Sequence, residues 1–212
     1  MGDLLKIKNL LMTPFIKLVI KHPKMMESKL FLQAMAYFPK KISHIYDEKM
    51  AASDMDYKVA FLEGLGNIGS EPDKVLDICA GTGFAALLVA NSFAEALIEA
   101  VDLSPEMVRI ARGKAEEAGY SHIRFETGNA RQLDYADEEF NLVVTSNAPV
   151  YLEEAARVLK PGGEMLITYS FGGAIFARAE EDIHKLLQKN GLELVKLKNI
   201  NKGVFILGRK GK

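Results

Sequence analysis

The chain of 212 residues has very little of the chemistry that metal sites and disulfides require. It contains one cysteine, Cys79, and no tryptophan. A single thiol cannot form an internal disulfide or a cysteine cluster, so a small buried residue is the better interpretation of Cys79. The four histidines are scattered, and none has the His-Glu or His-Cys spacing of a metal site. We therefore expect no bound metal.

A strong net charge is also lacking. The 27 basic and 28 acidic residues leave a formal net charge of −1, so nothing global attracts the chain to nucleic acid. The charge is uneven, because residues 1–50 carry nine lysines and four acids, and no arginine occurs before Arg109. No nucleic-acid partner is expected, and the basic segment needs another explanation.

No apolar run is long enough to span a membrane, and no small-residue cleavage site marks a secretion signal. Residues 4–24 are nevertheless apolar, with most of their lysines on one side of a helical wheel, although Pro14 and Pro23 would kink or divide a helix. Two interpretations stay open. The segment is a lid over a ligand site, or residues 1–29 lie on an anionic membrane surface.

These patterns predict two parts of the chain. Residues 1–56 would form the helical lid or membrane-interface segment, including a second apolar helix at about residues 29–38 that is buried or faces an apolar substrate pocket. Residues 57–212 would form the core domain. We expect a cytoplasmic protein, with a peripheral position on the inner face of a membrane as the alternative.

The segment Val75–Gly83 is the most informative part of the sequence. It predicts a buried strand that stops at an acid and runs into a glycine turn. Gly81 and Gly83 let the backbone approach a ligand where a Cβ would collide. A helix expected from Phe84 would point its free N–H groups and the positive end of its dipole at the same place. Together these features predict a nucleotide-type cofactor site.

Two cofactors compete for that site. Gly81, Gly83 and Ala86 match a dinucleotide fingerprint loosely, with Asp102 as the acid about 20 residues later. Asp77 favours S-adenosylmethionine, because a carboxylate repels a pyrophosphate but attracts the ammonium and sulfonium of the methionine end. The alternative for Asp77 is a helix-capping or salt-bridged acid.

Strands and helices alternate through the rest of the chain. A second strand ends at Asp102, Ser104 is the expected N-cap, and Pro105 begins a helix that runs to Ala118. Residues 201–203 signal a hairpin. The other expected elements are helices at 57–65 and 174–189, and strands at 123–127, 140–145, 164–170, 192–200 and 204–207. A further helix is expected to end within residues 155–163, at a proline-glycine stop.

With these motifs in this order, the chain resembles the class I S-adenosylmethionine-dependent methyltransferases, in the broad group that includes the ubiquinone and menaquinone biosynthesis methyltransferases. The segments that carry the resemblance are 75–83, 101–107, 128–130, 140–144 and 157–163. The resemblance implies an α/β fold with a Rossmann-like, doubly wound sheet of seven strands. That sheet would be mostly parallel, with a C-terminal antiparallel hairpin, beside N-terminal helices.

The resemblance also implies which residues hold S-adenosylmethionine. Asp77 and the glycine loop would hold the methionine part, Asp102 would bind the ribose hydroxyls, and Tyr46 would approach the methionine carboxylate. Ser146 would face the methionine amine and the transferred methyl. The loop residues are Cys79, Ala80, Gly81, Thr82 and Gly83.

On the adenine side, the resemblance implies that Leu103 and Met107 pack on the ring. Asn129 and Ala130 would meet its edge, through a side chain and a backbone N–H respectively. The chain departs from the family pattern at Asn129, where an aspartate is common. It departs also at Cys79, where a glycine usually stands, and at Asn141, which replaces an aspartate and is interpreted as structural.

Four polar residues are candidates to meet the methyl acceptor, and none is a firm catalytic residue. Residues 147–151 are similar to the Asn-Pro-Pro-Tyr motif of amino methyltransferases, in which the turn presents an amide nitrogen to backbone and side-chain acceptors. The alternative is a strand-to-helix turn with Pro149 near the first helical position. His44 is otherwise a surface histidine. The four candidates are His44, Tyr46, Asn147 and Tyr151.

Three functional hypotheses remain open. The first is methyl transfer to a small-molecule or lipid or quinone-like acceptor, mainly by positioning for in-line transfer. The second is a protein or nucleic-acid N-methyltransferase, and the third is a cofactor-binding module without catalysis. An NAD(P)-dependent oxidoreductase stays as the alternative for the glycine loop. Neither the acceptor, nor the atom methylated, nor the oligomeric state can be read from the sequence.

Overall fold

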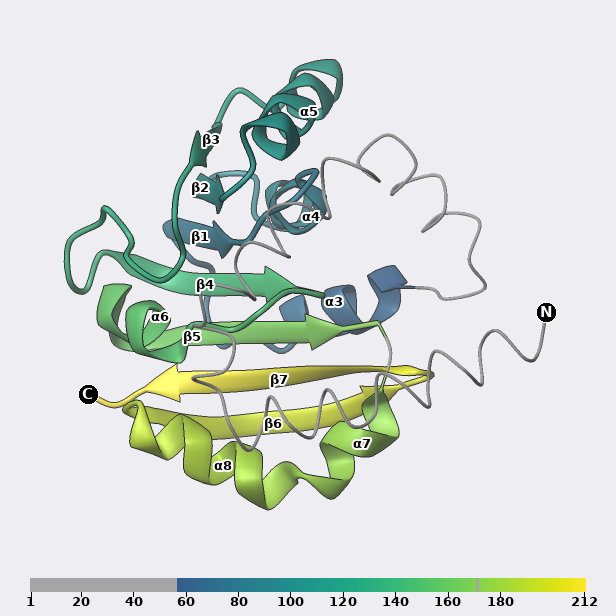
Figure 1. Cartoon of the computed structure of the whole chain (residues 1–212), viewed down its shortest axis with the longest axis vertical. Coiled ribbons are helices and arrows are strands. Elements are labelled where there is room, and N and C mark those ends of the chain that lie inside the picture. Colours follow the sequence, from purple (N-terminus) through teal and green to yellow (C-terminus); the bar gives the residue numbers. More distant parts are fainter. Residues whose placement is uncertain (1–56, 171) are drawn as a thin grey trace.

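The computed structural model describes residues 57–170 and 172–212. The predictions for residues 1–56, among them the lid, the helix at 29–38, His44 and Tyr46, lie outside the described residues. In the described part, a single sheet is covered by helices on both faces (Figure 1). No helix in this part is long and apolar enough to cross a membrane.

The sheet has seven strands in the order β3-β2-β1-β4-β5-β7-β6. All pairings are parallel except those of β7 with β5 and with β6, so the predicted fold class is confirmed. The central strands β1 and β4 are buried on both faces, which explains their continuous apolar sequences. The strands are β1 (Lys74–Ile78), β2 (Leu97–Asp102), β3 (Ile123–Thr127), β4 (Phe140–Ser146), β5 (Leu159–Tyr169), β6 (Leu192–Ile200) and β7 (Gly203–Lys210).

Each face of the sheet carries three helices and one hydrophobic cluster. Side chains alternate along β1, so Leu76 and Ile78 join the cluster under α6–α8 while Val75 joins the cluster under α3–α5. Asp77 therefore faces the side of α4. The helices are α3 (Tyr57–Leu65), α4 (Phe84–Ser92) and α5 (Pro105–Glu117) on one face, and α6 (Leu152–Val158), α7 (Gly173–Arg178) and α8 (Glu180–Lys189) on the other.

The boundaries of α5 follow from local capping chemistry. The Ser104 hydroxyl accepts a hydrogen bond from the Met107 N–H at 3.4 Å, and Pro105 occupies the first helical position. The helix ends beside Gly119, whose φ of 77° suits a residue without a Cβ. The expected start and end of this helix are therefore confirmed.

The predicted boundary between a helix that ends at the proline-glycine stop of residues 161–163 and a strand that begins at Glu164 is wrong. The helix α6 ends at Val158, and Leu159 already begins β5. Leu159 pairs with Phe140 at the start of β4, and a register shift before Leu142 absorbs the Pro-Gly-Gly sequence that follows. Pairing with a distant strand therefore outweighs the local helix signal of residues 155–160.

The predicted helix over residues 174–189 is also wrong as a single element. It is divided at Ala179, whose φ of −106° and ψ of 13° break the helical path between α7 and α8. The second helix opens with three acids, Glu180, Glu181 and Asp182. Carboxylates stabilise a helix N-terminus through its dipole, so this acidic run marks a helix start inside the longer apolar pattern.

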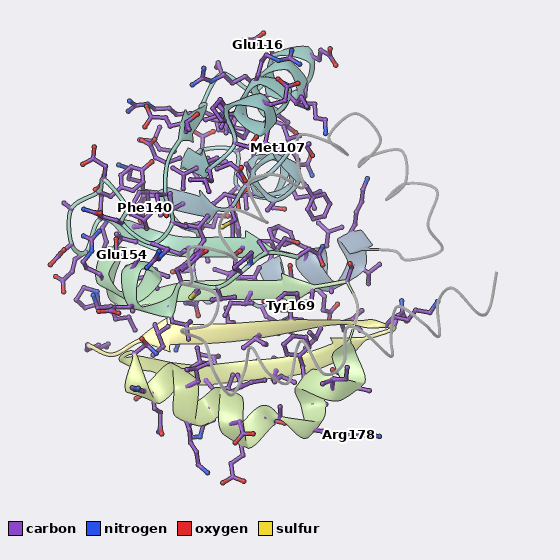
Figure 2. The ribbon with its side chains drawn as sticks, viewed as in Figure 1. Met107, Glu116, Phe140, Glu154, Tyr169 and Arg178 are labelled. Carbon is purple, nitrogen blue, oxygen red and sulfur yellow. The ribbon has the colours of Figure 1, made fainter. Side chains whose placement is uncertain are left out.

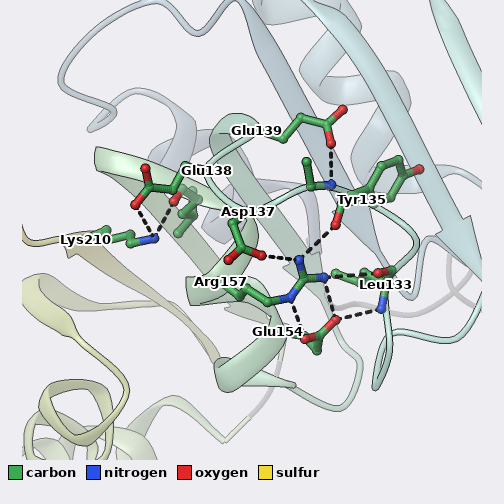
Figure 3. A network of polar contacts seen from close by, with 10 residues as sticks. Leu133, Tyr135, Asp137, Glu138, Glu139, Glu154, Arg157 and Lys210 are labelled. Carbon is green, nitrogen blue, oxygen red and sulfur yellow. Dashed lines mark hydrogen bonds and ion pairs between the residues drawn. The ribbon is translucent and has the colours of Figure 1, made fainter.

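A polar network centred on Arg157 fastens the connection between β3 and β4 to α6 (Figure 3). The guanidinium donates to the Glu154 carboxylate at 2.8 and 2.9 Å and to Asp137 at 2.7 Å. It also donates to the carbonyl oxygens of Tyr135 and Leu133, at 2.8 and 3.1 Å. One arginine thus satisfies backbone groups of a segment that has no helix or strand of its own.

Candidate functional site

The site lies where the carboxyl ends of β1 and β4 meet. These two strands are neighbours, and the chain leaves β1 toward β2 but leaves β4 toward β5. In open α/β sheets this reversal of direction opens a crevice in which ligands bind. The turn after β1 and the residues after β4 both lie at this edge, as the sequence predicts.

The turn after β1 depends on three residues with positive φ. Cys79, Gly81 and Gly83 have φ values of 59°, 54° and 85°. A Cβ on Gly83 would lie 3.1 Å from the Ala111 Cβ and 3.2 Å from the Phe125 ring, so this glycine is required for packing. A Cβ on Gly81 would meet nothing within 4 Å, which leaves open space beside the backbone. Gly81 is thus the position at which a ligand can approach.

Some backbone N–H groups of the turn already donate hydrogen bonds within the protein. The Ala80 N–H donates to the Val101 carbonyl at 3.0 Å, and the Gly83 N–H donates to the Ala80 carbonyl at 2.9 Å. Thr82 is buried, and Cys79 is partly buried, with burial raising the pKa of its thiol. These contacts fix the turn before any ligand binds.

Asp77 is a buried carboxylate with only one of its oxygens satisfied. Its side chain is 1% exposed, and Oδ2 accepts a hydrogen bond from the Ala86 N–H at 3.0 Å, in the first turn of α4. Oδ1 is buried and has no partner among the described residues. Burial, and secondarily repulsion by Asp102, raises the pKa of Asp77 to about 8. The helix-capping interpretation therefore accounts for one oxygen and leaves the other without a partner among the described residues.

Asp102 is held in a defined orientation by two backbone groups. Its Oδ2 accepts from the Gly81 N–H at 2.8 Å and its Oδ1 accepts from the Ser104 N–H at 2.9 Å. Burial raises the pKa of this carboxyl, and both hydrogen bonds oppose that rise. Each oxygen keeps a further lone pair, so the carboxylate can accept two more hydrogen bonds in fixed directions.

The end of β4 is joined to the end of β5 by side-chain hydrogen bonds. The hydroxyls of Thr168 and Ser146 are 3.0 Å apart. Asn147 has a φ of 53°, and its Oδ1 accepts from the N–H of Ser170 at 2.8 Å and from its hydroxyl at 3.0 Å. These contacts join the ends of β4 and β5 at the same edge of the sheet as the glycine turn.

Comparisons with known proteins agree with this geometry. Residues 75–163 match the family model described as Methyltransferase domain. A demethylmenaquinone methyltransferase of Bacillus velezensis is 36% identical over 104 residues, which are 45% of this chain and 45% of that protein. Residues 75–163 therefore carry a class I methyltransferase domain. The resemblance expected from the sequence is confirmed, although the match spans less than half the length of this curated relative.

Two solved structures share the fold of the methyltransferase domain. One is the putative methyltransferase in complex with the Haloferax volcanii Trm112 activator, with a TM-score of 0.63 and 17% identity over 74% of this chain and 91% of that chain. The other is the [4+2]-cyclase SpnF, with a TM-score of 0.68 and 15% identity over 84% of this chain and 95% of that chain. At these identities the likeness shows the fold alone.

The residues expected around an adenine ring lie on the other side of the glycine turn. Leu103 is 44% exposed although it is apolar, and Met107 is 6% exposed at the start of α5 (Figure 2). Ala130 is buried. Asn129 is exposed, and its Oδ1 accepts from the Arg131 N–H at 3.0 Å. An exposed leucine beside Asp102 leaves an apolar surface for a flat ligand in the methyltransferase domain.

Sequence reasoning missed Tyr169, the last residue of β5. Its hydroxyl donates to the Ala148 carbonyl at 3.0 Å, and its ring stacks on Phe176 at 4.7 Å between centroids. Burial raises the pKa of this phenol, so it keeps its proton at neutral pH. An aromatic residue at the carboxyl end of the strand next to β4 was the available signal.

Tyr151 lies in a different environment from Asn147, the other described residue that is a candidate to meet the acceptor. It precedes α6, and its ring packs against the hydrophobic cluster under α6–α8. Its carbonyl accepts from the Ala155 N–H at 3.0 Å. The turn at residues 147–151 is thus a strand-to-helix connection in which Asn147 and Tyr151 make separate contacts.

Proposed function

We propose that the chain transfers a methyl group from S-adenosylmethionine to a small-molecule acceptor of the lipid or quinone-like class. The observation that carries the proposal is the buried Oδ1 of Asp77, which has no partner among the described residues. A cationic group of a ligand would satisfy this oxygen. S-adenosylmethionine offers an ammonium and a sulfonium, whereas a dinucleotide would bring a pyrophosphate.

The cofactor supplies a methyl group already activated on its sulfonium. Asp102 would receive the two ribose hydroxyls, because its oxygens are held by the N–H groups of Gly81 and Ser104 with lone pairs to spare. Leu103 and Met107 would contact the adenine ring, and the end of β4 would face the acceptor. The chain then holds the acceptor in line with the methyl and excludes water.

We propose no general base. A base is needed only if the acceptor atom is protonated at the working pH. Among the described residues, Tyr169 at the end of β5 and Cys79 in the turn both have a raised pKa and stay protonated. Positioning would therefore supply most of the rate enhancement.

The quinone-like acceptor is supported by relatives named demethylmenaquinone methyltransferase. The match to this chain covers less than half of the length of each of these relatives. Residues 1–29 would supply the lid or the contact with an anionic membrane. Deleting residues 1–28 separates these roles. Loss of affinity for the cofactor indicates a lid, while retained cofactor binding with loss of binding to anionic liposomes indicates a membrane contact.

The decisive experiment is calorimetric titration with S-adenosylmethionine, S-adenosylhomocysteine and NADH. We expect micromolar binding of both adenosyl ligands and at least tenfold weaker binding in Asp102→Ala, because two hydrogen bonds to the ribose are lost. Binding of NADH alone would overturn the proposal in favour of an oxidoreductase. Adenosyl binding without methyl transfer to any lipid or quinone precursor would indicate a cofactor-binding module.

A further inference from the structure

Asn147 occupies a special place at the edge of the site. It directly follows β4, it is half-buried, and its φ of 53° is uncommon for a residue with a side chain. The neighbouring strand is β1, with Val144 paired to Asp77, so Asn147 lies at the same edge of the sheet as the glycine turn. Asn147 therefore follows β4 at the edge of the sheet that also carries the turn after β1.

The orientation of the Asn147 amide is fixed by its partners. A backbone N–H can only donate, so the atom that faces the N–H of Ser170 at 2.8 Å must be the amide oxygen. The Ser170 hydroxyl occupies the second lone pair of the same oxygen at 3.0 Å. The nitrogen, Nδ2, makes no hydrogen bond within residues 57–170 and 172–212. The side chain therefore presents two N–H donors and no free acceptor.

The hydroxyl pair beside Asn147 also has a hydrogen-bond donor to spare. Ser146 and Thr168 share one hydrogen bond of 3.0 Å, and two hydroxyls have two protons. Whichever hydroxyl donates within the pair, one proton stays available to an outside group. The end of β4 therefore offers donors from both the Asn147 amide and the hydroxyl pair, although the hydroxyls can also accept.

We infer that Asn147 positions the methyl acceptor through Nδ2 and selects acceptors that present a hydrogen-bond-accepting oxygen beside the methylated atom. An acceptor with an amine N–H at that place finds no free lone pair on Asn147. This inference rests on the proposed function. It separates the turn from the Asn-Pro-Pro-Tyr motif, in which the turn accepts hydrogen bonds from an amide nitrogen, because here the amide oxygen is already used by Ser170.

The test compares two bicyclic probes, the ketone 1-tetralone and the amine 1-naphthylamine, titrated into the full chain saturated with S-adenosylhomocysteine. We expect the wild type to bind the ketone about tenfold more tightly, the size of one hydrogen bond. Asn147→Asp keeps an oxygen for both Ser170 donors but replaces Nδ2 by an acceptor, so the preference for the ketone should disappear. Ser170→Ala keeps the backbone contact and Nδ2 but frees one lone pair of the amide oxygen, so the preference should fall less than in Asn147→Asp.

Two measurements, the affinity for S-adenosylhomocysteine and the affinities for the two probes, distinguish the possible outcomes. Affinity for S-adenosylhomocysteine should be equal in the wild type and Asn147→Asp, which shows that the variant is folded and the cofactor site intact. Equal affinity for the two probes in the wild type, an unchanged preference in Asn147→Asp, or binding of neither probe would overturn the inference and leave the proposed cofactor intact. Failure to bind S-adenosylhomocysteine would instead overturn the proposed function itself.

Discussion

At the scale of single residues, the site contrasts two carboxyl groups, buried Asp77 and half-buried Asp102, that have different numbers of partners. Both oxygens of Asp102 accept hydrogen bonds from the backbone, so this group is ready to receive a neutral hydroxyl. Asp77 has one satisfied oxygen and one buried oxygen without a partner in the described chain. An unsatisfied buried polar atom is costly, so Asp77 stabilises a complex more than it stabilises the free protein.

Binding of S-adenosylmethionine at pH 7 should release a proton from Asp77. The pKa of about 8 keeps this carboxyl mostly protonated in the free protein, and a cationic ligand would lower that pKa. Calorimetry in phosphate and in Tris, which differ in ionisation enthalpy, measures the released proton as a difference in observed heat. Asn keeps an acceptor for the Ala86 N–H, so Asp77→Asn should reduce this difference. The same difference in both proteins would refute the assignment.

The two glycines of the turn should fail in different ways when replaced by alanine. Gly83→Ala adds a Cβ that clashes with Ala111 and Phe125, and we expect a loss of about 2–3 kcal/mol in the free energy of unfolding. Gly81→Ala places its Cβ in open space, so only the positive φ is penalised, by about 1 kcal/mol. Its main effect should be loss of cofactor affinity. Urea unfolding and calorimetric titration of both variants measure the two effects, and unchanged affinity in a folded Gly81→Ala would count against the proposed site.

At the scale of helices and strands, the sequence predicts elements whose signals are local. The α5 helix was predictable because Ser104 and Pro105 set its start through contacts within one turn. The junction of α6 and β5 was not, because Leu159 is a strand residue only through its pairing with Phe140. The same limit applies to the site. The turn at Gly81 and Gly83 is visible in the sequence, whereas the contact between Asn147 and Ser170 joins residues 23 positions apart.

The Arg157 network should contribute strongly to the stability of the connection between β3 and β4. Arg157→Met removes the contacts with Glu154, Asp137 and two carbonyl oxygens, and it leaves the mostly buried Glu154 without its cation. We expect a loss of about 2–3 kcal/mol in urea unfolding. The control Arg109→Met removes a solvent-exposed pair with Glu106 and should leave stability unchanged. Equal effects of the two substitutions would contradict the role given to this network.

At the scale of the whole molecule, one sheet separates two hydrophobic clusters that share all of its central strands. Leu76 and Val75 are adjacent in β1 and belong to opposite clusters. Loss of either cluster therefore exposes the strands that support the other. We expect the described part to unfold as one cooperative unit.

The stability of the free protein should fall as the pH rises from 5 to 8. Asp77 has a pKa of about 8 when folded and an ordinary value of 3.8, so the unfolded chain loses this proton first. The stability due to the protonated group is complete below about pH 4 and is lost as the pH approaches 8, with a slope of up to about 1.4 kcal/mol per pH unit. Asp102 has the same direction of shift, so Asp77→Asn should reduce the slope without abolishing it. Urea unfolding at several pH values gives the slope, and an equal slope in wild type and variant would rule out the cause.

The position of β7 has a consequence for synthesis of the chain on the ribosome. β6 precedes β7 in the sequence, but β7 lies between β6 and the rest of the sheet. When the nascent chain has emerged only as far as Ile200, β6 lacks its native partner β7. The edge of β5 that pairs with β7 is then also open. Open strand edges invite pairing with other chains. The sheet can close only after Lys210 has left the exit tunnel, so this fold is completed after translation of β7, and an interrupted transcript would release an aggregation-prone fragment.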